Sequence, residues 1–205
     1  MAGKLKYALY VIFHPFKGFW DIKHEKRGSV PAALVLLGIY VLTSVLKGRY
    51  SGFLFNEYYP GVVNASLIII QSVMIYLLWC IANWCLTTLM DGEGGFKDIV
   101  TAIGYCVTPL IFGNIASTVL SNVVLLKESV FITYIDVVCI LWTGFLVLCA
   151  TLVVHQYTML KTVATSLLTV VGMMILVFIV LLCVSLVQQM LGFVDAVYKE
   201  FTYRL

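Results

Sequence analysis

DIVTAIGYCVTPLIFGNIASTVLSN, residues 98–122, carries no charged side chain after Asp98 and is apolar along most of its length. A helix of about 20 such residues crosses the hydrocarbon core of a bilayer, so this stretch can span a membrane. Pro109 lies near its middle, where a proline removes one backbone hydrogen bond and leaves the carbonyl group of Tyr105 without its usual partner. We therefore expect a membrane-spanning helix that kinks near its centre.

Small side chains recur at every fourth position in the second half of this stretch, at Gly113, Ser117 and Ser121. Residues four apart lie on the same face of a helix. Small residues on such a face allow the backbone of another helix to approach closely. The pattern predicts that residues 98–122 lie at the centre of a helical bundle.

The rest of the chain has the composition of a membrane protein. It is 62% hydrophobic and 11% charged, whereas soluble domains are about 45–50% apolar and about 25% charged. Long intervals without Asp, Glu, Lys or Arg recur along the sequence, and one further interval is interrupted only by Asp136 and His155. Each interval is long enough for a transmembrane helix. We expect five of them, at residues 30–46, 62–90, 98–122, 130–154 and 165–191.

The predicted fold class is an all-α integral membrane protein, with five transmembrane helices preceded by an N-terminal amphipathic interfacial helix. Residues 1–205 form one membrane domain: 1–29 are the cytoplasmic interfacial segment, 30–191 the five-helix bundle and 192–205 an exterior tail. Basic residues ahead of the first span outnumber Lys47 and Arg49, which follow it, and basic flanks stay in the cytoplasm. We therefore expect a cytoplasmic N-terminus, an exterior loop at residues 47–61 and an exterior C-terminus.

The N-terminal segment has an apolar and a basic face at helical spacing. Helices of this kind lie in the membrane interface and bury aromatic side chains at the level of the lipid headgroups. We expect His14–Pro15 and Gly18 to bend or divide the helix. The predicted interfacial anchors are Phe16, Phe19 and Trp20.

A metal site built from His14, Asp21, His24 and Glu25 is the alternative for this segment, but the spacing matches no HExxH or His-rich pattern. The six cysteines all fall inside predicted spans without CxxC spacing and are interpreted as packing residues. The sequence also contains no GxSxG or Walker A motif. We expect no catalytic residues, no metal, no cofactor and no nucleic-acid partner.

Several polar side chains fall at membrane depth, where an acidic residue is by default a functional candidate. They either form hydrogen bonds between helices or line a polar conduit for a lipid headgroup, an ion or a solute. The conduit would be lined by Asn83, Tyr105, Thr108 and Asn114. The full set of candidate packing and intramembrane residues is Asn83, Tyr105, Thr108, Pro109, Gly113, Asn114, Ser117 and Asp136.

The turn DGEGGFKD, residues 91–98, and the motif GYCVTP, residues 104–109, combined with five spans, resemble the Yip family of membrane proteins, named for interacting with Ypt/Rab GTPases. The resemblance covers nearly the whole chain. It is to the compact bacterial members, without the long N-terminal region and DLYGP motif of eukaryotic members. It implies a non-enzymatic protein of the bacterial cytoplasmic membrane that is linked to membrane organisation or transport.

Two functions follow as hypotheses. The first is a scaffold or accessory subunit that contacts the lipid bilayer and either forms a homo-oligomer or joins a partner membrane protein complex. The alternative is a protein that moves lipids or solutes, as a scramblase or transporter does, through a polar groove around the kinked third span. An open groove would favour the second function, and closed packing of its lining residues would favour the first.

Overall fold

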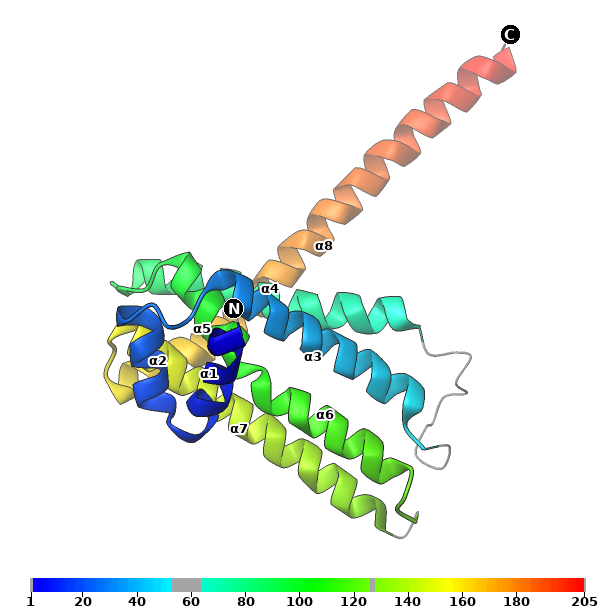
Figure 1. Ribbon diagram of the computed structural model, residues 1–205. Coiled ribbons are helices and arrows are strands. Elements are labelled where there is room, and N and C mark those ends of the chain that lie inside the picture. Colours follow the sequence, from blue (N-terminus) through cyan, green and yellow to red (C-terminus); the bar gives the residue numbers. More distant parts are fainter. Residues whose placement is uncertain (1, 53–63, 126–127, 205) are drawn as a thin grey trace.

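The computed structural model describes residues 2–52, 64–125 and 128–204, and this part of the chain folds into α-helices and their connections, with no strand (Figure 1). Five helical segments are long and apolar enough to cross a membrane, which confirms the predicted fold class. Residues 53–63, which include most of the predicted exterior loop and the start of the second predicted span, lie outside the described residues. The spans are α3 (Val30–Tyr50), α4 (Ala65–Leu89), α5 with α6 (Phe96–Cys106 and Thr108–Ser121), α7 (Ser129–His155) and α8 (Met159–Arg204).

The N-terminal segment forms two helices, α1 (Ala2–Phe13) and α2 (Pro15–His24), with the break at His14. Pro15 begins α2 because a proline at the first helical position loses no hydrogen bond. Gly18 does not break α2. It lies against α1 instead, where an added Cβ would stand 3.1 Å from the Cα of Val11. Both helices pack against the same end of the bundle, which we call the α2 end (Figure 1).

The third span is interrupted at Val107, between α5 and α6, close to the position where Pro109 predicted a kink. The hydroxyl group of Thr108 donates a hydrogen bond of 2.7 Å to the carbonyl oxygen of Tyr105, the group that the proline leaves without its helical donor. In the most apolar 18-residue stretch of this span, 72% of the residues are buried. The corresponding share is 33% in α7 and lower in the other spans. The third span therefore lies at the centre of the bundle.

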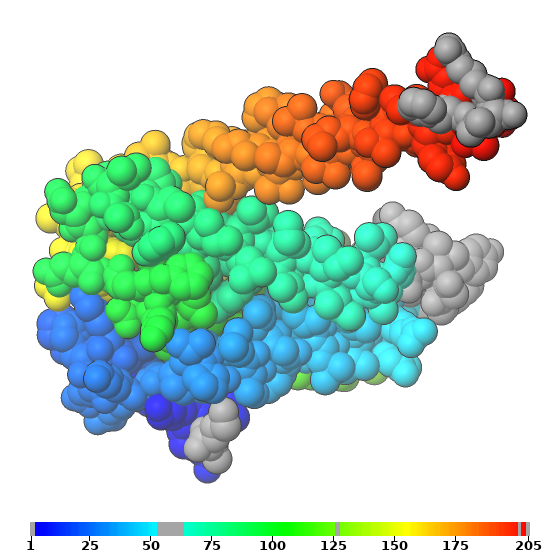
Figure 2. Space-filling model, turned by 90° about the horizontal axis from the view of Figure 1, so that it is seen from above, coloured from blue at the N-terminus to red at the C-terminus, as the bar shows by residue number. Residues whose placement is uncertain are grey.

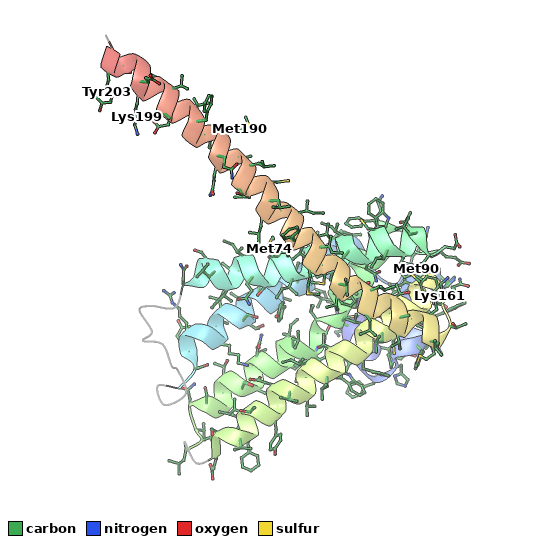
Figure 3. The ribbon with its side chains drawn as sticks, turned by 180° about the vertical axis from the view of Figure 1, so that it is seen from behind. Met74, Met90, Lys161, Met190, Lys199 and Tyr203 are labelled. Carbon is green, nitrogen blue, oxygen red and sulfur yellow. The ribbon has the colours of Figure 1, made fainter. Side chains whose placement is uncertain are left out.

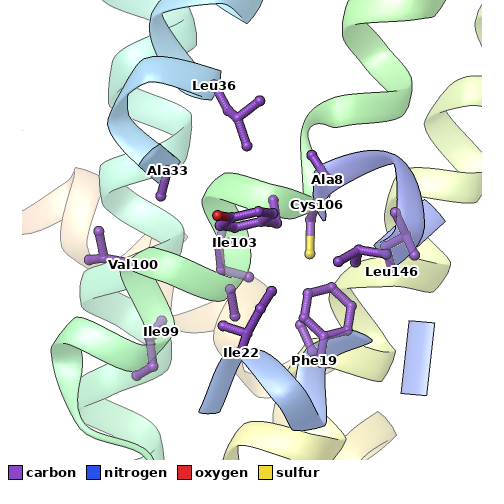
Figure 4. Close-up of a cluster of buried hydrophobic side chains, with 14 of the residues drawn as sticks. Ala8, Phe19, Ile22, Ala33, Leu36, Ile99, Val100, Ile103, Cys106 and Leu146 are labelled. Atoms are coloured by element: carbon purple, nitrogen blue, oxygen red, sulfur yellow. The ribbon is translucent and has the colours of Figure 1, made fainter. Parts of the chain in front are cut away.

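Gly104 determines how closely α5 approaches α3. A Cβ atom added to Gly104 would stand 2.9 Å from the Cα and 3.1 Å from the carbonyl oxygen of Ala33, so the two helices touch through their backbones. Ala33 itself is fully buried, and Figure 4 shows it at the edge of the central apolar cluster. Only glycine leaves room for this contact, which accounts for the first residue of the GYCVTP motif.

The small residues of α6 face two different neighbours. Gly113 faces α7, where an added Cβ would stand 2.8 Å from the Sγ atom of Cys139. Ser117 also contacts α7, whereas the hydroxyl group of Ser121 accepts a hydrogen bond of 3.0 Å from the backbone of Gly52. The stripe thus serves close packing, as small residues do in membrane helices.

α8 extends further than the sequence predicted. Residues 192–204, expected to form a tail after a span at 165–191, continue the same helix to Arg204. No proline interrupts this region, the single Gly192 costs only about 1 kcal/mol in a helix, and Asp195 and Lys199 form an ion pair of 2.7 Å one turn apart. Only the first turns pack on α4, and the remainder projects from the bundle (Figures 1 and 3).

We expect Gly104→Ala to lower the free energy of unfolding by about 1–3 kcal/mol, because the added methyl group must push α3 and α5 apart. Gly144→Ala is the matched control, since a Cβ at Gly144 meets no atom within 4 Å. Thermal unfolding of both variants in the same detergent measures the difference. Equal stability of the two variants would contradict the close contact between α5 and α3.

Candidate functional site

Asp136 lies two turns into α7, and both of its carboxylate oxygens have partners. Oδ1 accepts a hydrogen bond of 2.6 Å from the hydroxyl group of Ser117 on α6. Oδ2 forms an ion pair of 2.7 Å with the ammonium group of Lys47 near the end of α3. Both charged side chains are about 30% exposed. The acid thus joins three spans at the end of the bundle opposite the α2 end.

A small cavity of about 220 Å³ lies beside this pair, lined in part by Tyr40, Gly113 and Asn114. The side-chain amide of Asn114 donates a hydrogen bond of 3.0 Å to the hydroxyl group of Ser44 on α3. The polar groups here form contacts between helices, which are worth roughly 0.6 kcal/mol each in membrane proteins. We call this group of residues, with Lys47, Ser117 and Asp136, the Asp136 cluster.

A second polar cluster lies near the α2 end, around Asn83 of α4. The side-chain amide of Asn83 donates a hydrogen bond of 3.3 Å to Thr169 of α8, and its oxygen lies 3.2 Å from Nε2 of His155. Since that oxygen can only accept, Nε2 carries the proton. Asn83, His155 and Thr169 are all buried, so these bonds hold α4, α7 and α8 together away from water.

The glycine-rich turn covers the ring of His155. A Cβ at Gly92 would stand 2.6 Å from Nδ1 of His155, and one at Gly94 would stand 2.8 Å from Cε1 of the same ring. The hydroxyl group of Tyr157 donates to the carbonyl oxygen of Met90 at 3.1 Å, which fixes the start of the turn. Gly92 and Gly94 are therefore needed for close packing on His155.

The four residues expected to line a conduit do not line one together. Tyr105 is fully buried and donates a hydrogen bond of 3.1 Å to the carbonyl oxygen of Lys4, and Thr108 is buried and bonded to Tyr105. Asn83 belongs to the cluster near the α2 end, whereas Asn114 lies beside Ser44. Their polar groups are satisfied within the protein.

A different opening exists on the side of the bundle. A lateral cleft of about 400 Å³ lies between α3, α4, the third span and α7. Its lining includes the polar side chains of Ser44, Gln71 and Ser72, together with Trp79 and Thr143. Within the described part of the chain, the buried indole nitrogen of Trp79 and the buried hydroxyl of Thr143 have no hydrogen-bond partner.

The predicted interfacial anchors have different environments. Phe19 is fully buried in the apolar cluster beneath Cys106 and Leu146 (Figure 4), so it packs inside the bundle and contributes about 1.5–3 kcal/mol of burial. Phe16 and Trp20 are about half exposed at the α2 end. The helical periodicity placed all three on one face, but only two of them are accessible to lipid.

A hydrogen bond between polar side chains also joins α1 and α2. The hydroxyl group of Tyr7 donates a hydrogen bond of 2.7 Å to the buried carboxylate of Asp21. Burial, and then Asp21, raise the pKa of Tyr7 well above its ordinary value, so the phenol keeps its proton and this bond persists at neutral pH. Asp21 thus has a structural role, because it holds α1 against α2. No group of three or more His, Cys, Asp or Glu side chains among the described residues could hold a metal ion.

Several members of these clusters were not expected from the sequence, among them Lys47 and His155. Lys47 was counted only as a charge flanking the first span, and His155 as part of a loop. The one available signal was that Asp136 and His155 are the only residues that interrupt an otherwise uncharged stretch. A buried charge or imidazole requires a partner, but the sequence does not say which helix supplies it.

This architecture defines a class: a helical membrane protein of five spans, with buried polar clusters that join them. The family model of the Yip1 domain matches residues 9–186, which is most of the chain, and the protein therefore belongs to the Yip1 domain family. The predicted family is confirmed. Comparisons with curated proteins and with solved structures find no match.

We expect a double-mutant cycle on Lys47 and Asp136 to show coupling. Lys47→Met leaves the carboxylate of Asp136 without its counter-ion. This substitution should lower the free energy of unfolding by about 1–3 kcal/mol, which lies between the values for exposed and for buried ion pairs. Adding Asp136→Asn should restore at least about 0.5 kcal/mol of this loss. Unfolding of the two single variants and the double variant in detergent measures the cycle.

The ion pair of Asp195 and Lys199 is the control, because it is exposed on α8 and forms within one helix. Such pairs contribute about 0.3–0.5 kcal/mol, so Lys199→Met should change the stability little. Equal effects of Lys47→Met and Lys199→Met would show that the Asp136 cluster does not stabilise the bundle.

Proposed function

We propose that this protein is a non-enzymatic accessory protein of the membrane, which docks a second membrane protein or a second copy of itself through the projecting part of α8. The observation that carries this proposal is the exposure of α8 beyond Thr169. Thr162, Thr165 and Thr169 are fully buried on the bundle, whereas none of the 18 residues in the most apolar stretch of the same helix is buried. Figure 2 shows α8 separating from the other helices along its course.

The length of α8 also supports a docking role. Its 46 residues correspond to about 69 Å at 1.5 Å per residue, roughly twice the thickness of the hydrocarbon core of a bilayer. The last turns still expose large apolar side chains, among them Leu191, Phe193 and Tyr198. An unsupported helical segment of about 15 residues is only marginally stable in water, and a large exposed apolar surface marks an interaction site. A partner that covers these turns would stabilise them.

The closed packing of the interior supports the same function. Asn83, Tyr105 and Thr108 are at most 4% exposed, and each is hydrogen-bonded within the protein. A species that moved along this route would have to break these bonds, and an unsatisfied polar group in hydrocarbon costs several kcal/mol. Docking requires no such change.

Cysteine cross-linking tests docking through α8, because Cys183 is already exposed on this helix. We expect oxidation in native membranes to give a covalent adduct through Cys183 or through a neighbouring position. To test every face of the helix, the cysteine is moved to each of the next three positions in a Cys183→Ala background, by Val184→Cys, Ser185→Cys or Leu186→Cys. The adduct should form at one or two of these four positions, since a docked helix presents one face.

Cys85 is the control, because it is exposed on α4; Cys85→Ala should leave the cross-link unchanged. An adduct with twice the mass of the chain identifies a second copy, and one of another mass identifies a different membrane protein. If none of the four positions gives an adduct, either by oxidation or after attachment of a thiol-directed photocrosslinker that needs no thiol on the partner, α8 does not dock a partner.

We also propose the bacterial cytoplasmic membrane as the location, with the α2 end facing the cytoplasm and the C-terminus outside. The basic residues of α1 and α2 support this orientation. We expect a membrane-impermeant maleimide added outside intact cells to label a single cysteine at Ser129 and not one at Ser29, in a background without other cysteines. Labelling only of the cysteine at position 29 would show that the protein has the opposite orientation in the membrane.

The lateral cleft favours a second candidate, a protein that moves lipids along its surface. The polar side chains of Ser44, Gln71 and Ser72 line a space of about 400 Å³ at membrane depth, and a lipid headgroup could hydrogen-bond to them. In this case, vesicles that contain the protein would exchange labelled lipid between leaflets faster than empty vesicles.

Ser72→Phe and Thr143→Phe would fill this cleft and slow the exchange, whereas Thr133→Phe, at an exposed position on the same helix as Thr143, would not. If the wild-type protein does not accelerate exchange, lipid movement through the cleft is excluded and the accessory function stands alone.

A further inference from the structure

A pocket of about 320 Å³ at the α2 end collects four lysine side chains. Its walls come from the first turns of α1, from the connection between α2 and α3, from the first turns of α5 and from the last turn of α7. The charged residues that line it are Lys4, Lys23, Lys26, Lys97 and Asp98.

Gly28 allows this pocket to form. It is buried in the connection between α2 and α3, where an added Cβ would stand 2.8 Å from a methyl carbon of Ile22 and 3.0 Å from one of Thr101. The connection therefore lies directly against α5, and this contact brings Lys26 and Lys97 to the same cavity although they are far apart in sequence.

The positive charge of the pocket exceeds its negative charge. Asp98 is the one acidic residue in the lining, and its Oδ2 atom accepts a hydrogen bond of 3.1 Å from the backbone amide of Gly95. Lys23 donates to the carbonyl oxygen of Val154 at 2.9 Å and lies 3.4 Å from Glu93, and Lys4 donates to the carbonyl oxygen of Gly28 at 3.3 Å.

Two ammonium groups remain without partners. Within the described part of the chain, those of Lys26 and Lys97 have neither a hydrogen bond nor an ion pair. Like charges that line one pocket repel each other, and an anion between them would remove that repulsion.

The pocket also contains the starts of two long helices. Ser29 and Val30 begin α3, and Lys97 and Asp98 lie in the first turn of α5. Free backbone N–H groups at such helix starts attract anions. Ser29 makes no side-chain hydrogen bond to the first turn of α3, so the N–H groups of Val30 and Ala32 have no side-chain cap, and Pro31 between them has no N–H.

We propose that this pocket binds a phosphate group, supplied either by the headgroup of an anionic phospholipid or by a soluble phosphate compound. Phosphate suits the site because its oxygens accept several hydrogen bonds at once, and lysine and helix starts are its usual donors. A phospholipid headgroup would enter the pocket from the membrane surface. Phe16 and Trp20 of α2 are exposed at the same end of the protein. The proposal does not depend on docking through α8.

The test compares two double variants of the full-length protein with the same change in charge. Lys26→Gln with Lys97→Gln removes the two unpaired ammonium groups of the pocket. Lys6→Gln with Lys17→Gln removes two exposed lysines of α1 and α2 that do not line it. Binding of short-chain phosphatidylglycerol and of short-chain phosphatidylcholine is measured in detergent, and inorganic phosphate and glycerol 3-phosphate are titrated separately.

We expect the wild-type protein to bind phosphatidylglycerol more tightly than phosphatidylcholine. At about fivefold in affinity for each lysine, the pocket variant should lose about 25-fold. Lys6 and Lys17 do not line the pocket, so their replacement should change the binding of a single short-chain lipid in detergent little. Binding of phosphatidylglycerol alone identifies the lipid source, and binding of the free phosphates identifies a soluble one. Absence of binding by all of these probes, or equal losses in both double variants, would overturn the proposal.

Protection of amines in the wild-type protein provides a measurement that needs no variant. The bound phosphate should slow acylation of Lys26 and Lys97, and leave the rates at Lys6 and Lys17 unchanged. Uniform rates at all four lysines, with and without the phosphate probes, would also refute the site.

Discussion

The hydrogen bond from the hydroxyl group of Thr108 to the carbonyl oxygen of Tyr105 allows a broken helix to lie at the centre of this bundle. Hydrocarbon offers no donor to a carbonyl group that a proline has released, so the break is tolerated only where the protein itself supplies one. Thr108 supplies it from the position just before Pro109. The central location follows, because the interrupted backbone must be surrounded by protein, and Gly104 then permits the close contact with Ala33.

The basic residues at the α2 end stabilise the ends of neighbouring helices as well as marking the orientation of the chain. Lys23 donates to a carbonyl oxygen in the last turn of α7, and Lys161 donates at 2.7 Å to the carbonyl oxygen of Met90, directly after α4. Figure 3 shows Lys161 beside Met90. Cations at the C-terminal ends of helices satisfy orphan carbonyl groups and interact favourably with the helix dipole. The α2 end of the bundle therefore needs positive charge for its own stability. The lysines there that donate to no carbonyl oxygen are the ones available to a ligand.

The elements that the sequence predicted correctly depend on local properties. Uncharged length predicted the five spans, Pro109 predicted the break, and Pro15 predicted the division of the N-terminal segment, because each acts within a few residues of its own position. The pairing of Lys47 with Asp136 was missed because it depends on how α3 and α7 meet, about ninety positions apart in the sequence. Phe19 was grouped with Phe16 and Trp20 for the same reason. Periodicity defines one face of a helix but not how much of that face another helix covers.

The distribution of satisfied polar groups bears on which part of the protein interacts with other molecules. Inside the bundle, Asn83 and Asp136 are bonded to other spans and Tyr105 is bonded to α1, and such bonds rigidify a structure because breaking one leaves a polar group unpaired. Among the described residues, the projecting part of α8 has no such bonds to other spans. Its distal turns contact no other helix of the described chain, and its large side chains are exposed. Lipid can solvate such side chains at membrane depth but cannot do so beyond the membrane, and a helix of about 69 Å exceeds the hydrocarbon core unless it tilts strongly. The contrast between a closed interior and an uncovered helix therefore favours association through α8 over passage through the bundle.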